Sequence, residues 1–245
     1  MSVGAAAEPE TPQRRQRPVI AIDGPAGAGK STLAAHLARR FGFLNLETGA
    51  MYRALALKAI ENDIDLDSEA ELLDLAGHTT IVLEPQRDGN RVVLDHIDVS
   101  NRLREPDVTA AASRASVHPQ VRAWMVTRQQ ALGAAGGVVM EGRDIGTVVF
   151  PDAEVKIFLD ADPEVRGNRR YRQVGSHAQA PPAVTEAAVL AEMRERDQRD
   201  RNRAESPLRP AEDAIVLDST GMTLEEVLAR SEEIVRSHIQ FSASN

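Results

Sequence analysis

The chain has 245 residues, of which 42% are hydrophobic, so it can bury one sizeable core. Its formal net charge is −8 and only 3% of its residues are aromatic, which disfavours a protein that covers a nucleic-acid backbone and stacks bases. The absence of cysteine excludes disulfides and thiolate chemistry and suits a reducing compartment. We therefore expect a single cytoplasmic domain that binds no nucleic acid.

The start of the chain differs in composition from the rest. Residues 1–17 are rich in Ala, Pro, Gln and Arg and contain no apolar segment resembling a signal peptide. No apolar run anywhere approaches the roughly 18 residues of a membrane span. We predict a disordered tail over 1–17 and one domain over 18–245, with no membrane partner.

The beginning of the domain reads as a strand, a loop and a helix. The apolar residues 19–22 end at Asp23 and a glycine-rich turn, after which Leu33 and Leu37 begin a four-residue spacing. Helical stretches separate nearly all of the other apolar runs, which are 43–46, 137–140, 155–159 and 214–217. Continuous apolar runs that alternate with helices predict a parallel α/β sheet covered on both faces.

Two segments break this pattern. Residues 81–99 read as two or three short antiparallel strands, with turn residues at 87–90. Residues 175–182 contain Gly, Ser, Pro and His between two arginine-rich helical segments, which predicts a mobile loop.

The turn after the first strand fits the pattern GxxxxGK[ST], directly between a strand and a helix. In such a loop the backbone N–H groups surround the β-phosphate of a nucleoside triphosphate, the lysine reaches the β- and γ-oxygens, and the hydroxyl can bind Mg²⁺. We predict Ser31 as the Mg²⁺ ligand and Lys30 as catalytic. The predicted ATP-binding residues are Gly24, Pro25, Ala26, Gly27, Ala28, Gly29, Lys30, Ser31 and Thr32.

This loop alone does not identify an activity. The [NT]KxD motif with which GTPases read guanine is absent, because the other two lysines follow Leu57 and Val155. An acidic strand end of the hhhhDE type, common in ATPase motors, is also missing. A small-molecule kinase is therefore the leading class, and an ATP-binding regulatory or partner-binding module is the alternative outside enzymes.

A kinase needs cations around the transferred group, because positioning and charge neutralisation dominate phosphoryl transfer. Arg143 follows a predicted strand, where ligands gather in α/β sheets. Arg196, Asp200 and Arg203 recur at i, i+4 and i+7, so one helical face could hold a sugar diol and a base edge. The competing interpretation is an exposed helix with pairs such as Asp197 with Arg201.

From residue 19 to the C-terminus the chain resembles bacterial cytidylate kinases. The resemblance rests on the P-loop and on three further segments, which are Glu47 to Arg53, Glu141 to Pro151 and Arg196 to Arg203. It implies a P-loop nucleoside monophosphate kinase fold, with a five-stranded parallel sheet flanked by helices. It also implies a small antiparallel insert in an acceptor-binding region at about 47–113, and a short lid at about 164–185.

The resemblance further implies the activity and the residues that carry it. The reaction would be Mg²⁺- and ATP-dependent phosphorylation of CMP or dCMP to CDP or dCDP by a monomer.

The catalytic residues would be Arg143, Arg169 and Arg170 together with Lys30, and Arg166 would belong to the lid with Arg169 and Arg170. Ser113, Arg122 and Asp144 would read cytosine, and Asp200 the ribose hydroxyls. The predicted substrate-binding residues are Thr48, Tyr52, Arg53, Ser113, Arg122, Arg143, Asp144, Arg196, Asp200 and Arg203, with Arg104 as an addition to the phosphate pocket. Another acceptor, such as UMP, AMP or a polyol, is the alternative within kinases.

Overall fold

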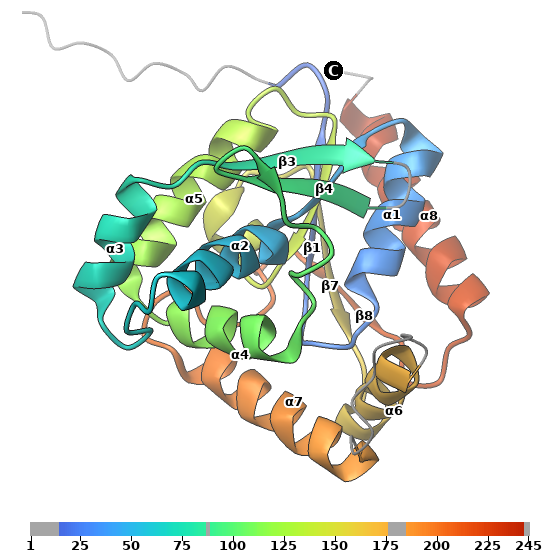
Figure 1. Cartoon of the computed structure of the whole chain (residues 1–245). Coiled ribbons are helices and arrows are strands. Elements are labelled where there is room, and N and C mark those ends of the chain that lie inside the picture. The colour runs from blue at the N-terminus through green and yellow to red at the C-terminus, as the bar shows by residue number, and fades with distance from the viewer. Residues whose placement is uncertain (1–14, 87–88, 176–184, 243–245) are drawn as a thin grey trace, which may run out of the picture.

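The computed structural model describes residues 15–86, 89–175 and 185–242 (Figure 1). Its centre is a parallel sheet of five strands in the order β2-β6-β1-β7-β8. The strands are β1 (Val19–Asp23), β2 (Leu44–Glu47), β6 (Val138–Gly142), β7 (Val155–Asp160) and β8 (Ile215–Asp218). The predicted five-stranded parallel sheet is thus confirmed, and each predicted apolar run is one of its strands.

Helices cover both faces of this sheet, as Figure 1 shows. Successive residues of β1 point to opposite faces, so Val19 and Ala21 belong to one hydrophobic cluster and Ile20 and Ile22 to another. Helices α2 and α5 pack in the first cluster, whereas α1 and α8 pack side by side in the second. The helices are α1 (Lys30–Phe41), α2 (Thr48–Glu61), α3 (Glu69–Gly77), α4 (Pro106–Ala115), α5 (Pro119–Gly133), α6 (Pro163–Gly175), α7 (Glu186–Asn202) and α8 (Leu224–Ser242). Across the described ranges, none of these helices is long and apolar enough to cross a lipid bilayer.

A second, antiparallel sheet lies between α3 and α4 in the chain and confirms the predicted insert. Its strands are β3 (Ile81–Gln86), β4 (Gly89–Leu94) and β5 (Ile97–Asp98). Gly89 and Asn90 were predicted as turn residues, but they already belong to β4 and pair with Gln86 and Pro85. Gly89 adopts a φ of +140°, which favours glycine, and the other two predicted turn residues, 87 and 88, lie outside the described part of the chain.

Buried Asp23 at the end of β1 fixes the segment that follows β6. Its two carboxylate oxygens accept hydrogen bonds from the backbone N–H groups of Ile145 at 2.8 Å and Gly146 at 2.7 Å. These residues begin a π-helical turn, η1 (Ile145–Val149), that no sequence pattern predicted. Since both oxygens are occupied, Asp23 acts as a structural link between two strand ends of the central sheet.

The chain is attached to the domain before β1. Arg15 Nη2 donates to both carboxylate oxygens of Asp152 at 2.7 Å, and the guanidinium lies over the ring of Phe150 at 4.9 Å. Arg17 donates to the carbonyl oxygen of Gly42 at 2.6 Å. These two residues were assigned to the disordered tail, whereas the structure ties them to the domain; residues 1–14 lie outside the described part of the chain.

Candidate active site

The P-loop connects β1 to α1 and has the backbone geometry that its glycines allow. Gly24 has a φ of +148°, and a Cβ there would lie 2.0 Å from the carbonyl oxygen of Leu159 on β7. Gly29 caps α1 in the left-handed conformation with a φ of 100°. Lys30 is buried at the first turn of α1, where Nζ donates to the carbonyl oxygen of Pro25 at 2.7 Å. The strand, loop and helix predicted from the motif are thus confirmed.

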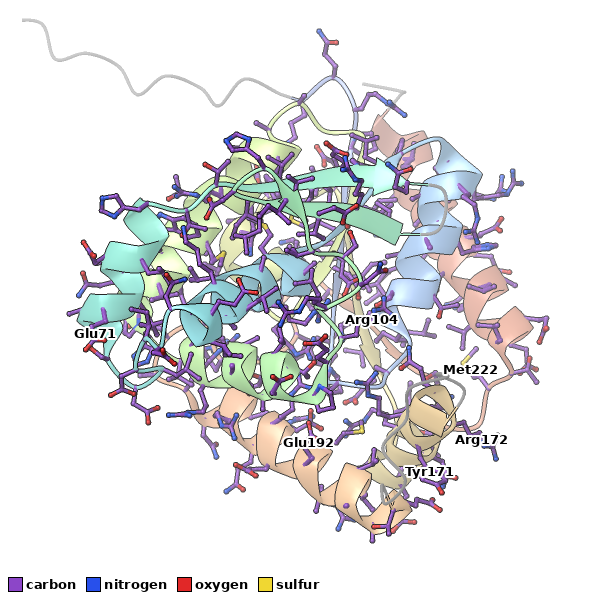
Figure 2. All side chains as sticks on the ribbon, in the orientation of Figure 1. Glu71, Arg104, Tyr171, Arg172, Glu192 and Met222 are labelled. Atoms are coloured by element: carbon purple, nitrogen blue, oxygen red, sulfur yellow. The ribbon has the colours of Figure 1, made fainter. Side chains whose placement is uncertain are left out.

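One cavity of about 1050 Å³ extends from the P-loop to α2, α4 and α7. All of the predicted substrate-binding residues line it, as do the predicted catalytic arginines Arg169 and Arg170. P-loop residues from Ala26 to Thr32 line it as well, whereas Gly24 and Pro25, which were also predicted to bind ATP, do not. Figure 2 labels three further lining residues, Arg104 before α4, Glu192 on α7 and Met222 before α8.

An acidic residue organises the arginines at one wall of the cavity. Asp200 on α7 accepts a hydrogen bond from Arg143 Nε at 2.9 Å and lies 3.7 Å from Arg203 Nη1. Burial acts to raise the pKa of Asp200, but the charges of Arg143, Arg203 and Arg196 outweigh it and hold the pKa below its usual value. Asp200 therefore remains ionised and keeps the neighbouring guanidinium groups in place.

A second buried ion pair lies beside the first. Arg122 on α5 pairs with Asp144, and Arg122 also lies 5.7 Å from the ring centroid of Tyr52. Burial raises the pKa of Tyr52 to about 12, so its hydroxyl stays protonated and can donate. Ser113 on α4 completes this corner, where its hydroxyl oxygen accepts from Arg199 Nη1 at 2.5 Å.

Four buried nitrogen atoms of residues that line the cavity have no hydrogen-bond partner within the described residues. They belong to arginines of the predicted acceptor site and are Arg53 Nε, Arg122 Nε, Arg196 Nε and Arg203 Nη2. Burial, followed by the charge of Arg143, lowers the pKa of Arg196 to about 10. Because unpaired buried N–H groups are costly, this wall is suited to a ligand rich in anionic and acceptor oxygens.

The arginines of α6 lie in three different surroundings. Arg169 and Arg170 line the cavity, and Arg169 donates to the hydroxyl and carbonyl oxygens of Ser219 at 3.0 and 2.9 Å. Arg166, expected in the lid, is instead 3% exposed and donates to Asp197 and to the carbonyl oxygens of Ala161 and Ala26. Arg172 and Tyr171 are exposed and lie away from the cavity (Figure 2).

The partner of Asp197 also corrects the competing interpretation of α7 as an exposed helix. Asp197 is buried and pairs with Arg166 at 2.5 Å, while Arg201 lies 3.9 Å from Asp160. The predicted pair of Asp197 with Arg201 is therefore wrong, because Asp197 faces α6 and the P-loop. The charge-rich helix α7 directs two carboxylates inward, one to a structural contact and one to the cavity.

The family model described as cytidylate kinase matches residues 20–237. The chain belongs to the cytidylate kinase family. It is 47% identical over 224 residues to the cytidylate kinase of Vibrio parahaemolyticus, covering 91% of this chain and 98% of that protein. It is also 50% identical over 212 residues to the cytidylate kinase of Aeromonas salmonicida, covering 86% and 91% of the two chains.

Two residues of this cytidylate kinase family member have oxygen donors suited to a magnesium ion. Ser31 lies at the start of α1, and Glu141 lies near the end of β6. Ser31 and the buried Glu141 both line the cavity, and Glu141 Oε1 has no hydrogen-bond partner among the described residues. Burial, followed by the charge of Glu47, raises the pKa of Glu141. Within the described residues no three acidic or histidine side chains form a metal cluster. The donors fit Mg²⁺, which commonly takes one or two protein ligands together with substrate phosphates and water.

Some lining residues were not among the predicted ones. Glu47 pairs with Arg53 and lies 3.7 Å from Arg104, so it holds two cavity arginines. The segment from Met222 to Leu224 lines the cavity beyond the P-loop. Glu47 could have been found from its place at a strand end, but Met222 and its neighbours follow an ordinary strand and carry no motif.

The lowered pKa of the buried Lys30 predicts that the stability of the protein depends on pH. Burial, followed by the charge of Arg143, lowers the pKa of Lys30 from 10.5 to about 7. Between these values the unfolded chain binds more protons than the folded chain, so the free energy of unfolding should rise with pH, at up to about 1.4 kcal/mol per pH unit. Urea unfolding from pH 7 to 10 measures this slope for the wild type and for Lys30→Met. The variant should lack this contribution, and equal slopes would contradict the shifted pKa.

Proposed function

We propose that the protein transfers the γ-phosphoryl group of ATP to CMP, giving CDP and ADP, and that it also accepts dCMP. Family membership supports the reaction class. The observation that carries the acceptor site is the set of four buried arginine nitrogens without partners, all on the same cavity as the P-loop. A cavity with a triphosphate loop at one end and arginines with unsatisfied N–H donors at the other suits two phosphorylated ligands facing each other.

On the donor side, the N–H groups of the P-loop would bind the β-phosphate, and Lys30 would reach the γ-phosphate. Ser31 and Glu141 would hold Mg²⁺, directly or through water, and the ion would neutralise charge on the phosphates. Protonated Lys30 is required for this contact, and bound phosphates would raise its lowered pKa. Arg169 and Arg170 would contact the same phosphates from α6, since both already line the cavity.

On the acceptor side, Arg53 and Arg143 would bind the CMP phosphate. Arg122 would donate to the acceptor atoms of cytosine and Asp144 would accept from its amino group, a pattern that uracil does not offer. Ser113, Thr48 and Tyr52 would supply further hydrogen bonds. Arg196, Asp200 and Arg203 would hold the nucleoside, with Asp200 accepting from the ribose hydroxyls.

The transfer would need no general base, because the attacking phosphate oxygen of CMP is already anionic near neutral pH. The protein would align the two phosphates in line and neutralise the charge that develops on the transferred group. Lys30, Arg143, Arg169 and Arg170 are the cations available for this task. Exclusion of water from the closed cavity would limit hydrolysis of ATP.

The test of this proposal is the release of ADP with and without acceptor. CMP should stimulate ADP release strongly, and the second product should be CDP. The alternative function, an ATP-binding regulatory module, would bind ATP but show no acceptor-stimulated turnover. The expectations of a monomer, a cytoplasmic location and no nucleic-acid partner remain predictions.

A further inference from the structure

We propose that Asn90 is a positioning residue that joins the antiparallel insert to the edge of the central sheet and thereby holds the acceptor-binding arginines. This inference rests on the proposed function for the role of those arginines. Asn90 does not line the cavity, and no sequence motif includes it.

The inference starts from the open edge of the central sheet. Strand β2 is the outermost strand and pairs only with β6 within the sheet. On its other side, Asn90 Oδ1 accepts from the backbone N–H of Glu47 at 2.8 Å, and Asn90 Nδ2 donates to the carbonyl oxygen of Asn45 at 2.7 Å. A single side-chain amide thus occupies the donor and acceptor positions that a neighbouring strand would supply.

The same residue belongs to the second sheet through its backbone. Asn90 lies in β4 and pairs with Pro85 of β3. Since its backbone is held by one sheet and its side chain by the other, Asn90 adds a polar connection to the apolar contacts that Leu83, Val92 and Leu94 of the insert make with the core. We refer to the two side-chain hydrogen bonds of Asn90 to β2 as the edge clasp.

The edge clasp acts on a residue that organises the cavity. Glu47 is the last residue of β2 and the cap of α2, and its carboxylate pairs with Arg53 and Arg104. Burial acts to raise the pKa of Glu47, but the charges of Arg53 and Arg104 outweigh it and lower the pKa, so Glu47 is ionised. A displacement of the Glu47 backbone would therefore move two cations that face the acceptor phosphate.

Loss of the clasp should affect acceptor binding more than folding, because water can replace a hydrogen bond at a partly buried strand edge. For Asn90→Ala we expect the KM for CMP to rise roughly tenfold while the KM for ATP stays unchanged. The Glu47 amide should exchange with solvent at least about tenfold faster, because the variant removes its one acceptor among the described residues. Steady-state kinetics and hydrogen exchange followed by NMR measure the two effects.

Arg91→Ala is the matched control. Arg91 neighbours Asn90 on β4 but points to the exposed side, where it pairs with Glu84 and Asp98. It should change neither the KM for CMP nor the exchange of the Glu47 amide. Asn90→Asp keeps the Oδ1 acceptor of the Glu47 amide but puts an oxygen in place of the Nδ2 donor to the Asn45 carbonyl. If the alanine variant does not fold, this variant should still raise the KM for CMP and not that for ATP, without faster exchange of the Glu47 amide.

The proposal is overturned if Asn90→Ala keeps the wild-type KM for CMP, or if it raises the KM values for CMP and ATP equally. Normal exchange of the Glu47 amide in that variant would also overturn it. A wild-type protein that CMP does not stimulate would instead refute the proposed function, while the exchange of Glu47 would still show whether the edge clasp exists.

Discussion

Replacing Lys30 with alanine should lower kcat by roughly 1000-fold, the scale observed when a preorganised cation is removed from a phosphoryl-transfer site. Lys30 is 7% exposed and begins α1 directly behind the P-loop, so no other lysine can replace it. Its effect should be larger on kcat than on the KM for ATP, because the charge on the transferred group grows in the transition state. ADP release at saturating ATP and CMP measures the loss.

Lys58→Ala is the control for this change. Lys58 donates to the carbonyl oxygen of His78 at 2.8 Å and pairs with Asp95, and it does not line the cavity. Its kcat should remain near that of the wild type. A kcat for Lys30→Ala within about tenfold of the wild type would contradict the proposed contact with the γ-phosphate.

Replacing Asp200 with alanine should lower kcat/KM for CMP by roughly 100-fold and for dCMP by only about tenfold. Two effects contribute to the loss. The variant leaves Arg143 and Arg203 without their shared carboxylate, which affects both acceptors. It also removes the proposed acceptor for the 2′-hydroxyl, which only CMP carries, so the ratio between the two acceptors should fall.

The ratio of kcat/KM for CMP to that for dCMP distinguishes a contact of Asp200 with the 2′-hydroxyl from a purely structural role. Asp200→Asn keeps an oxygen acceptor and should retain part of the preference for CMP. Arg201→Ala, on the exposed side of the same helix, should retain all of it, because Arg201 does not line the cavity. Equal losses with CMP and dCMP for Asp200→Ala would restrict Asp200 to ordering the arginines.

Local patterns were sufficient to predict the sheet and the P-loop. The strand before Gly24 and the helix after Lys30 follow from apolar periodicity and glycine placement, and both are as expected. Arg196 and Asp200 lie one turn apart on α7 as their spacing predicts, whereas Arg203 follows the end of the helix in an extended conformation; all three line the cavity. These features depend on residues close in sequence, which is why the sequence is informative about them.

Features that depend on distant contacts were not predictable in this way. Arg166 and Arg169 are both arginines of α6, yet only the position of Asp197 on α7 decides that Arg166 is structural. The π-helical turn η1 requires the carboxylate of Asp23, which lies more than a hundred residues earlier in the chain. The edge clasp of Asn90 likewise joins segments that no periodicity relates.

The strongest test of CMP as the substrate is a comparison of acceptors. Values of kcat/KM measured separately with CMP, dCMP, UMP and AMP, at fixed ATP and Mg²⁺, report how the cavity distinguishes bases. CMP should give the highest value, dCMP should follow, and UMP and AMP should be poorer by at least roughly tenfold, the effect of one mismatched polar contact. Equal stimulation by all four acceptors, or none by any, would contradict the assignment of CMP as the substrate.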